Sequence, residues 1–209
     1  MIPAIAETVA IAKYLLMIEA TGVKAHFGLL SCGASVDLIR AAKAKGLPVT
    51  ADVAMHQLHL TEQLTDGFNS LAHVRPPLRS EQDKALLRQG VKEGVIDAIC
   101  THHEPLSSSA KMAPFAETQP GITAFDTYVA LGVQLIQESL FEPLEWVEKV
   151  TSIPAQVANM TERWQQEAGW VLVDPELEWV VSKETILSQG KNTPLLGQTL
   201  KGKAIQTFI

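Results

Sequence analysis

The hydrophobic pattern of the chain switches between helical and strand periods along residues 3–160. Its first segment predicts an amphipathic helix that begins at Pro3 and ends at Gly22. The expected buried face repeats every three or four residues: Ile5, Val9, Ala12, Leu16 and Ala20. Because the chain opens on a well-formed helix, we expect that it lacks a preceding part.

Strand-like and helix-like segments then alternate. The predicted strands cover 23–31, 48–60 and 95–101. The predicted helices cover 33–46, 80–94, 125–139, 143–152 and 154–160, and Ser80 is an N-cap candidate. Such alternation is typical of right-handed βαβ units, so we expect the α/β class with a parallel sheet.

The pattern changes after residue 160. Two short strands, 169–181 and 201–209, are predicted around an irregular loop at 188–202, with a turn at Asp174-Pro175 in the first of them. We therefore expect two domains, an α/β domain over 1–160 and a small C-terminal β appendage over 161–209.

Composition excludes several classes of function. Hydrophobic residues make up 46% of the 209 residues, which is enough for a packed core, and the net charge is −6. The negative charge argues against binding nucleic acid or an anionic membrane surface. No apolar run reaches the length of a membrane helix, and the N-terminus lacks the basic region of a secretory signal. Cys32 and Cys100 form no CxxC pair, so we expect free thiols in a cytoplasmic protein.

Candidate chemistry lies where the predicted strands end. Parallel α/β folds place their sites past the carboxyl ends of the strands, which here read LLSC, MHQL and THHEP. A metal-dependent hydrolase would put His, Asp or Glu there, because zinc needs three or four ligands and a carboxylate to take a proton from its water. His56, His102 and His103 are the available histidines.

Four motifs in the right order are similar to the dihydroorotase family of the amidohydrolase superfamily. The first motif resembles a family segment in which one strand ends in His-Leu-Ser and the next begins with Val-Thr-Ala-Glu-Val. In this chain it reads VKAHFGLLSCGASVDLIRAAKAKGLPVTADV. The family's Asn-Pro-Pro-Leu-Arg segment and its Asp-x-Ile-x-Thr-Asp-His-Ala-Pro segment resemble VRPPLRSEQDKALLRQGVKEGVIDAICTHHEP. Two later family segments resemble PGITAFDTYVAL and SQGKNTPLLGQTLKGKAI. The resemblance covers nearly the whole chain.

The resemblance implies that the functional positions are altered. The family's metal-ligand histidine falls at Leu29, and the aspartate that shuttles the proton falls at His102. The asparagine that contacts substrate falls at Arg75, and the histidine that binds the substrate carboxylate falls at Leu106.

Positions that shape turns and loops are retained: Pro76, Pro77, Leu78, Arg79, His103, Pro105, Pro120 and Gly121. We expect a remnant ligand pocket formed by Arg75, His103, Pro120 and Gly121. No catalytic residue, metal ion or other cofactor is expected. A metal, if bound, would use His102, His103 and His56.

The family resemblance also implies a fold and a missing part. The chain is expected to supply the last three strands of a (β/α)8 barrel, while the family's other metal ligands lie in an N-terminal half. Three strands cannot close a barrel, and an open parallel edge is a pairing hazard. We therefore expect this chain to pair with its own N-terminal half, a second copy or a partner protein.

Three functions remain open from the sequence. The leading hypothesis is a catalytically inactive dihydroorotase-like protein of pyrimidine biosynthesis, with a structural or assembly role beside aspartate carbamoyltransferase, as the resemblance implies. The first alternative is an active zinc-dependent dihydroorotase that hydrolyses the dihydroorotate ring amide. The second is a sensor that binds a small carboxylate through Arg75 and Gly121.

Individual residues also keep two interpretations. Adjacent residues on an extended segment point to opposite sides, so His102 and His103 are expected to fill space rather than share a metal. Arg75 would either bind an anion or pair with Glu104 or Asp97. His56 is expected to be a polar residue with a satisfied ring.

Overall fold

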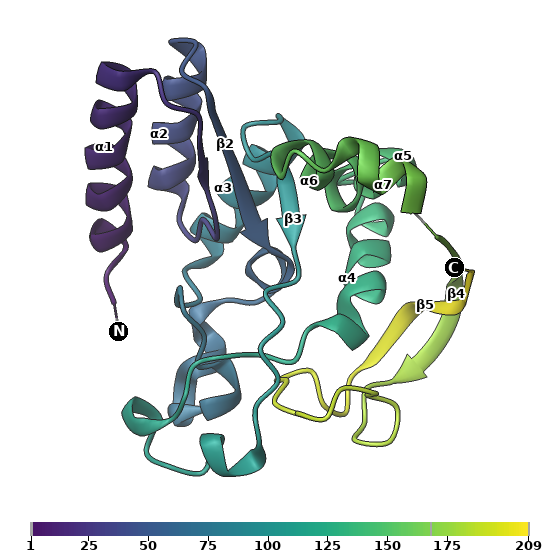
Figure 1. The fold of residues 1–209 in the computed structure, drawn as a ribbon. Helices are drawn as coiled ribbons and strands as arrows, with labels where there is room; N and C mark the ends of the chain where they lie inside the picture. The colour runs from purple at the N-terminus through teal and green to yellow at the C-terminus, as the bar shows by residue number, and fades with distance from the viewer. Residues whose placement is uncertain (1, 168, 209) are drawn as a thin grey trace. The chain divides into compact units, whose positions relative to one another are not determined.

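The computed structural model describes residues 2–167 and 169–208 (Figure 1). It divides into two compact units whose segments interleave along the chain. Unit 1 comprises Met1–Glu62 and Pro76–Cys100, and unit 2 comprises Gln63–Arg75 and Thr101–Ile209. We describe each unit by itself.

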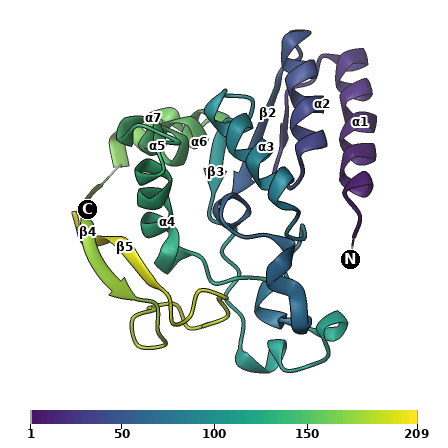
Figure 2. The ribbon, with the colours of Figure 1, turned by 180° about the vertical axis from the view of Figure 1, so that it is seen from behind.

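Unit 1 is a parallel three-stranded sheet with helices. Its elements are α1 (Ala4–Thr21), β1 (Ala25–Phe27), α2 (Gly33–Ala44), β2 (Val49–Ala54), the 3-10 turn η1 (Met55–Leu58), α3 (Glu81–Lys92) and β3 (Ala98–Cys100). The strand order is β1-β2-β3, with both neighbouring pairs parallel. Figure 2 shows α1, α2 and α3 side by side. The predicted α/β class with a parallel sheet is confirmed.

The core of unit 1 lies between the sheet and its helices. β2 buries one of its two faces, since Ala51 and Val53 have no exposed surface, while Thr50 and Asp52 on the other face are half-buried. Gly90 of α3 permits a close helix contact, because a Cβ there would lie 2.7 Å from Val36 Cγ1 on α2. Ile39 of α2 and Leu87 of α3 are also fully buried.

The predicted buried face of the first helix is wrong. Ile5, Val9 and Leu16 are 63%, 60% and 69% exposed, whereas Ile11, Leu15 and Ile18 are the buried residues. Apolar residues occur on more than one side of α1, so periodicity could not decide which side faces the core.

Three predicted strands are too long. β1 spans Ala25–Phe27 rather than 23–31, β3 spans Ala98–Cys100 rather than 95–101, and β2 ends at Ala54, where the chain turns into η1. The predicted second strand included Met55–Leu58, which are buried in a 3-10 turn instead.

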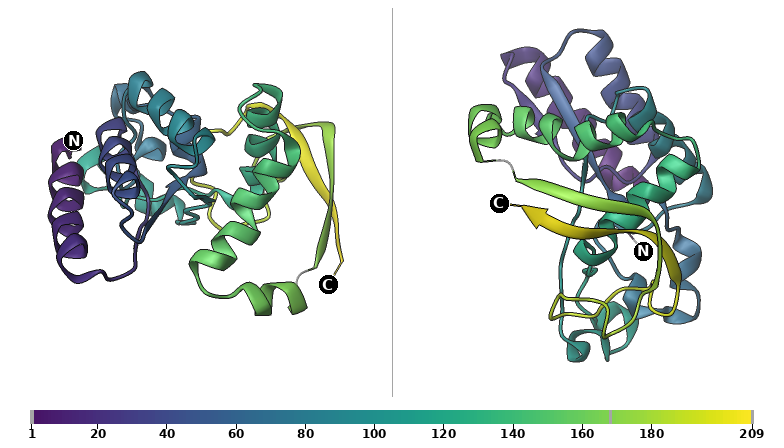
Figure 3. Two further views of the ribbon diagram at one scale, coloured as in Figure 1. Left: turned by 90° about the horizontal axis from the view of Figure 1, so that it is seen from above. Right: turned by 90° about the vertical axis from the view of Figure 1, so that its right-hand side faces the viewer.

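Unit 2 combines short helices with a separate antiparallel sheet. Its helices are η2 (Glu62–Phe68), η3 (Ser70–Ala72), η4 (Ser108–Lys111), η5 (Phe115–Glu117), α4 (Phe125–Gln137), α5 (Pro143–Val150), α6 (Ser152–Val157) and α7 (Thr161–Glu167). β4 (Trp170–Val180) pairs antiparallel with β5 (Thr199–Phe208), and Figure 3 shows the two strands side by side. The predicted domain boundary near residue 160 stays a prediction.

The turn predicted at Asp174-Pro175 is wrong. β4 continues through these residues, and its register with β5 shifts between Asp174 and Glu178. Proline has no N–H to give to a ladder, so an irregularity in the pairing accommodates it. The Asp174 carboxylate accepts from the Glu176 N–H at 2.9 Å within this irregularity.

No helix in the described ranges 2–167 and 169–208 is long and apolar enough to cross a membrane. Cys32 and Cys100, as expected, are free thiols.

The half-buried carboxylate of Glu7 joins the start of α1 to the start of α2. Glu7 accepts hydrogen bonds from the Ser31 N–H at 3.0 Å, from the Ser31 hydroxyl and from the Ser35 hydroxyl at 2.6 Å. Arg79, only 7% exposed, lies 3.8 Å from the same carboxylate and donates to Ser31 Oγ and to the Ile2 carbonyl. Arg79, one of the retained family positions, therefore has a structural role here.

We predict that Glu7→Gln lowers the free energy of unfolding by about 1–3 kcal/mol, because buried donors lose a charged acceptor. The matched control is Glu19→Gln on the same helix, whose exposed pair with Lys45 is worth less than about 1 kcal/mol. Urea unfolding followed by far-UV circular dichroism measures both. Equal effects of the two substitutions would contradict the role given to Glu7.

Candidate functional site

Asp52 is the centre of a polar cluster at the sheet of unit 1. Its carboxylate accepts from His26 Nε2 at 2.9 Å, from the Leu29 N–H at 2.7 Å and from Cys100 Sγ at 3.5 Å. His26 also contacts Thr50 Oγ1 through Nδ1 at 2.8 Å. Burial opposes ionisation of Asp52, but the hydrogen bonds from His26 and Leu29 outweigh it and hold the pKa of this carboxyl below its ordinary value.

The sequence interpretation missed this cluster. A signal was available, because Asp52 stands in VTADV where the resembled family strand reads Val-Thr-Ala-Glu-Val. Its interaction with His26 on β1 depends on the register of the two strands, which pairs His26 with Thr50.

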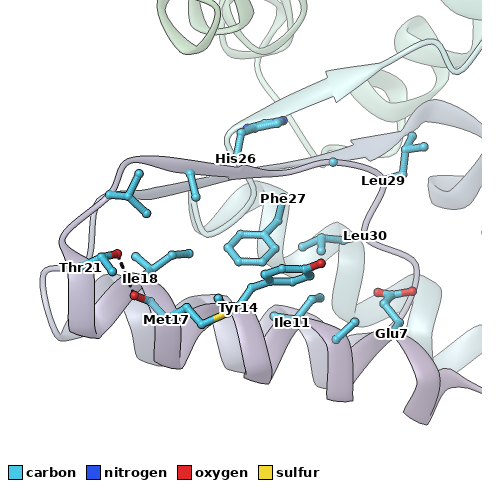
Figure 4. Close-up of a pocket in the computed structure, with 14 residues that line it drawn as sticks. Glu7, Ile11, Tyr14, Met17, Ile18, Thr21, His26, Phe27, Leu29 and Leu30 are labelled. Atoms are coloured by element: carbon cyan, nitrogen blue, oxygen red, sulfur yellow. Dashed lines mark hydrogen bonds between the residues drawn. The ribbon is translucent and has the colours of Figure 1, made fainter.

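Leu29 occupies the predicted metal-ligand position and keeps an unusual backbone. Its φ is 61°, in the left-handed region, which costs a residue with a Cβ roughly 1–2 kcal/mol. The N–H bond to Asp52 holds this conformation in place. Figure 4 shows Leu29 and His26 on the side of the chain away from α1. A hydrocarbon side chain therefore stands where the resemblance implies a ligand.

His56 lies in η1, directly after β2, and is only 2% exposed. The retained prolines also act within unit 1, because Gln57 Nε2 donates to the carbonyls of Pro76 and Pro77, both at 3.2 Å. These contacts fix η1 against the Pro-Pro segment.

His103 caps a helix of unit 2. Its Nδ1 accepts from the N–H groups of Ala124 and Phe125, both at 3.1 Å, where α4 begins. The ring stacks on Phe125 at a centroid distance of 4.2 Å. Burial lowers the pKa of His103, with Asp126 opposing the shift, so the neutral ring that the cap requires is favoured.

His102, at the predicted proton-shuttle position, also has a left-handed backbone, with φ at 47°. Its Nε2 lies 3.7 Å from the Glu104 carboxylate. The two adjacent histidines thus have different surroundings: His102 lies beside a carboxylate and His103 on the end of α4.

Asn192 joins three segments of unit 2. Its Oδ1 accepts from the Leu106 N–H and the Thr123 hydroxyl, both at 2.7 Å. Its Nδ2 donates to the carbonyls of Glu104 at 3.0 Å and Gly121 at 3.1 Å. Asn192 is 3% exposed, so these four bonds form away from water.

Gly121 fits this arrangement only without a side chain. Its φ is +145°, and a Cβ would lie 3.0 Å from Glu104 Cβ. Gly121 also donates its N–H to the His73 carbonyl at 2.9 Å. Gly121 therefore lies against the segment that carries His102 and His103, and its hydrogen-bond partners are the His73 carbonyl and the Asn192 amide. The predicted ligand pocket stays a prediction. Pro120 precedes it in the same loop.

The Arg75 side chain is exposed. The pKa of His73 is lowered chiefly by burial, and the positive charges of Lys111 and Arg75 lower it further. Lys43 binds both oxygens of Asp97 at 2.7 and 2.8 Å, and the Ala51 N–H donates to Asp97 as well. The predicted pair of Arg75 with Glu104 or Asp97 stays a prediction.

The side chains that this chain presents do not fit the zinc ion implied by the resemblance. Within residues 2–167 and 169–208, no three His, Cys, Asp or Glu side chains form a group that could hold a metal. Leu29 has no donor atom, and His103 uses Nδ1 to cap α4. We derive no chemical step through a metal.

Comparisons with known proteins identify the family. No family model matches the chain. Over its whole length the chain is 41% identical to a dihydroorotase-like protein of Pseudomonas aeruginosa and 37% identical to a dihydroorotase of Syntrophus aciditrophicus, and it covers 50% of each. The chain thus spans about half the length of these curated relatives. The predicted kinship with the dihydroorotase family is confirmed for the half of the relatives that the chain covers. The expectation that the chain corresponds to their C-terminal half stays a prediction.

Solved structures show the same fold. A D-hydantoinase from Thermus sp. superposes with a TM-score of 0.90 at 20% identity, over 99% of this chain and 48% of that protein. The inactive dihydroorotase-like domain of a CAD-like multifunctional protein from Chaetomium thermophilum gives a TM-score of 0.70 at 19% identity, over 95% of this chain and 53% of that one. The fold is therefore that of about half an amidohydrolase, which is consistent with a partial barrel.

We predict that Asn192→Ala lowers the free energy of unfolding by about 3 kcal/mol or more, because it leaves several buried backbone groups without their partner. Gln189→Ala, at an exposed position three residues earlier, is the control and should change it by less than about 0.5 kcal/mol. All four tryptophans lie in unit 2, so tryptophan fluorescence during urea unfolding reports on this unit. A small effect of Asn192→Ala would show that Asn192 does not join the segments.

We predict that unit 2 loses stability as the pH falls from about 7.5 to about 5.5, because His103 and His73 resist protonation when folded and accept a proton near pH 6.5 when unfolded. His103→Asn keeps an acceptor for the cap and removes the titrating ring, so its stability should fall less. Adding His73→Asn should flatten the profile further. Identical slopes in all three proteins, measured by fluorescence-detected unfolding, would contradict this account.

Proposed function

We propose that this chain is part of a dihydroorotase-like protein of pyrimidine biosynthesis that does not catalyse, with a structural or assembly role beside aspartate carbamoyltransferase. The sheet of unit 1 and its helices would be three strands of a (β/α)8 barrel. A cytoplasmic location and a homo-oligomer belong to the same proposal.

The observation that carries the proposal is the environment of Leu29. The backbone there still has the left-handed conformation and the N–H bond to Asp52 at 2.7 Å, but the side chain cannot bind a metal. A metal-activated water needs a ligand set and a proton acceptor. An imidazole, His102, stands where the resemblance implies the accepting carboxylate.

The relatives give further support. Two proteins from Pseudomonas, 41% and 40% identical to the chain, are described as dihydroorotase-like, and two relatives described as dihydroorotase are 37% and 35% identical to it. The Chaetomium domain that shares the fold is described as inactive and as part of a multifunctional protein. A non-catalytic domain that assembles with other activities is therefore a precedent for this fold.

The competing function is an active zinc-dependent dihydroorotase. Relatives of that description, at 33–37% identity over the whole chain, favour it. It requires metal ligands and a proton acceptor from the part of the relatives that this chain does not cover.

The first test is metal content together with hydrolysis of dihydroorotate. We expect the chain, purified without chelator or affinity tag, to hold less than about a tenth of an equivalent of zinc and to show no hydrolysis with added zinc. The Syntrophus dihydroorotase, prepared in the same way, is the positive control. One or two equivalents of zinc retained through dialysis, with hydrolysis, would overturn the inactive assignment.

The second test concerns the assembly role. Aspartate carbamoyltransferase from the same organism, co-expressed with the chain, should co-elute with it at a fixed stoichiometry in size-exclusion chromatography. Separate elution at micromolar concentrations would remove the structural role, whatever the zinc content.

A further inference from the structure

Three lysines line one cavity of unit 2. The cavity has a volume of about 450 Å³, and Lys111, Lys183 and Lys191 lie in its wall. Ser107 and Ser108 add two hydroxyl groups. No aspartate or glutamate is among the described residues that line it. Because the chain as a whole has a net charge of −6, the positive charge at this cavity is a local feature.

Lys111 is a buried cation that contacts no carboxylate of the described residues. It is 7% exposed, and its Nζ donates to the carbonyls of His73 at 3.1 Å and Gln119 at 2.8 Å. An ammonium group has three N–H donors, so one remains for a ligand. Burial lowers the pKa of Lys111 to about 8, although the charge of Glu104 opposes this shift. A bound anion would supply a counter-charge for this buried ammonium group.

Lys183 and Lys191 come from the loop that follows β4. Lys191 donates to the Ile186 carbonyl at 2.5 Å, whereas Lys183 is exposed and makes no hydrogen bond or ion pair within the described residues. A hydrogen bond with Ser182 is the main cause that lowers the pKa of Glu184, and the charges of both lysines lower it further. Glu184 is exposed and does not line the cavity, so both ammonium groups can still bind an anion.

Hydrogen bonds fix the backbone segments that carry the three lysines. Asn192, the residue after Lys191, accepts from the Leu106 N–H at 2.7 Å and thereby joins the loop after β4 to the segment that leads into η4. The Ser70 hydroxyl donates to the Lys111 carbonyl at 2.8 Å, which joins the end of η4 to η3. The wall of the cavity is therefore formed before a ligand arrives, which lowers the entropic cost of binding.

The residue types indicate which anion fits. A phosphate group on a small molecule has a charge of about −1.5 to −2 at pH 7 and three strong acceptor oxygens, and lysine binds it as a point charge. Three lysines match this charge better than the single charge of a carboxylate. Cavities of about 300–1,000 Å³ are typical of small-molecule sites. We propose that this cavity binds a small molecule through a phosphate group, which Lys111, Lys183 and Lys191 hold by their ammonium groups.

The cavity is separate from the positions that the resemblance assigns to metal and proton transfer. Leu29, His102, His103 and Arg75 do not line it. Leu106, where the resemblance implies the histidine that binds the substrate carboxylate, does line it but has a hydrocarbon side chain. The proposal therefore does not rest on the proposed function, and neither zinc binding nor hydrolysis of dihydroorotate enters it.

The test is isothermal titration calorimetry of the full 209-residue chain with inorganic phosphate and with pyrophosphate. The buffer contains about 0.1 M salt, which screens attraction between distant charges. We expect pyrophosphate to bind at one site with a Kd below about 1 mM. Dihydroorotate, whose acidic group is a carboxylate, should not displace it. No saturable binding of either phosphate probe, or displacement by an equal concentration of dihydroorotate, would overturn the proposal.

Matched variants locate the site. Lys183→Gln removes an exposed lysine of the cavity and should weaken pyrophosphate binding at least about tenfold, because a hydrogen bond to a charged group is lost. Lys111→Gln removes the buried ammonium group and should weaken it as much. Lys13→Gln makes the same charge change at an exposed position of α1 that does not line the cavity, and should change the Kd less than about twofold.

Circular dichroism checks that each variant folds. If Lys111→Gln does not fold, the comparison of Lys183→Gln with Lys13→Gln still decides the matter. Equal weakening by these two variants, or by neither, would reject the cavity as the phosphate site.

Discussion

The helices of a parallel sheet bury the sheet face that they cover, and the structure of unit 1 depends on this constraint. β2, with strands on both sides, buries Ala51 and Val53 completely, while Thr50 and Asp52 on its other face are half-buried and belong to the polar cluster around Asp52. β1 has a partner strand on one side only within the described residues, and several apolar side chains of α1 stay exposed. An apolar cavity lies between α1 and β1.

The retained family positions make hydrogen bonds that join segments of the fold. Arg79 lies with Glu7 over the start of α2, the carbonyls of Pro76 and Pro77 hold Gln57, and His103 caps α4. These contacts join segments that are far apart in sequence, and each would leave buried polar groups unsatisfied if it were lost. The left-handed backbones at Leu29 and His102 belong to the same framework.

The fold could be predicted further than the site. Alternating periods predicted the parallel strands and their helices because each element buries its own repeating face. The buried side of α1 and the turn at Met55–Leu58 were predicted wrongly for one reason. A residue pattern can indicate burial, but it does not indicate which element covers a residue or which backbone conformation that residue adopts. At the site, Leu29 stood out because its side chain has no donor atom, and His102 stood out because an imidazole stands where the resemblance implies an aspartate. Asp52 was missed because its role arises from His26, which is twenty-six positions away.

The sequence by itself determined the class of fold, the kinship with dihydroorotases and a side chain without a metal-binding atom at Leu29, since these depend on residue type and order. Only the tertiary structure decided which side of α1 is buried, which carbonyls Asn192 holds, that His103 must be neutral to cap α4, and that an apolar cavity lies between α1 and β1. Hydrogen bonds and burial between distant segments are properties of three-dimensional neighbours, and a pattern along one chain does not contain them.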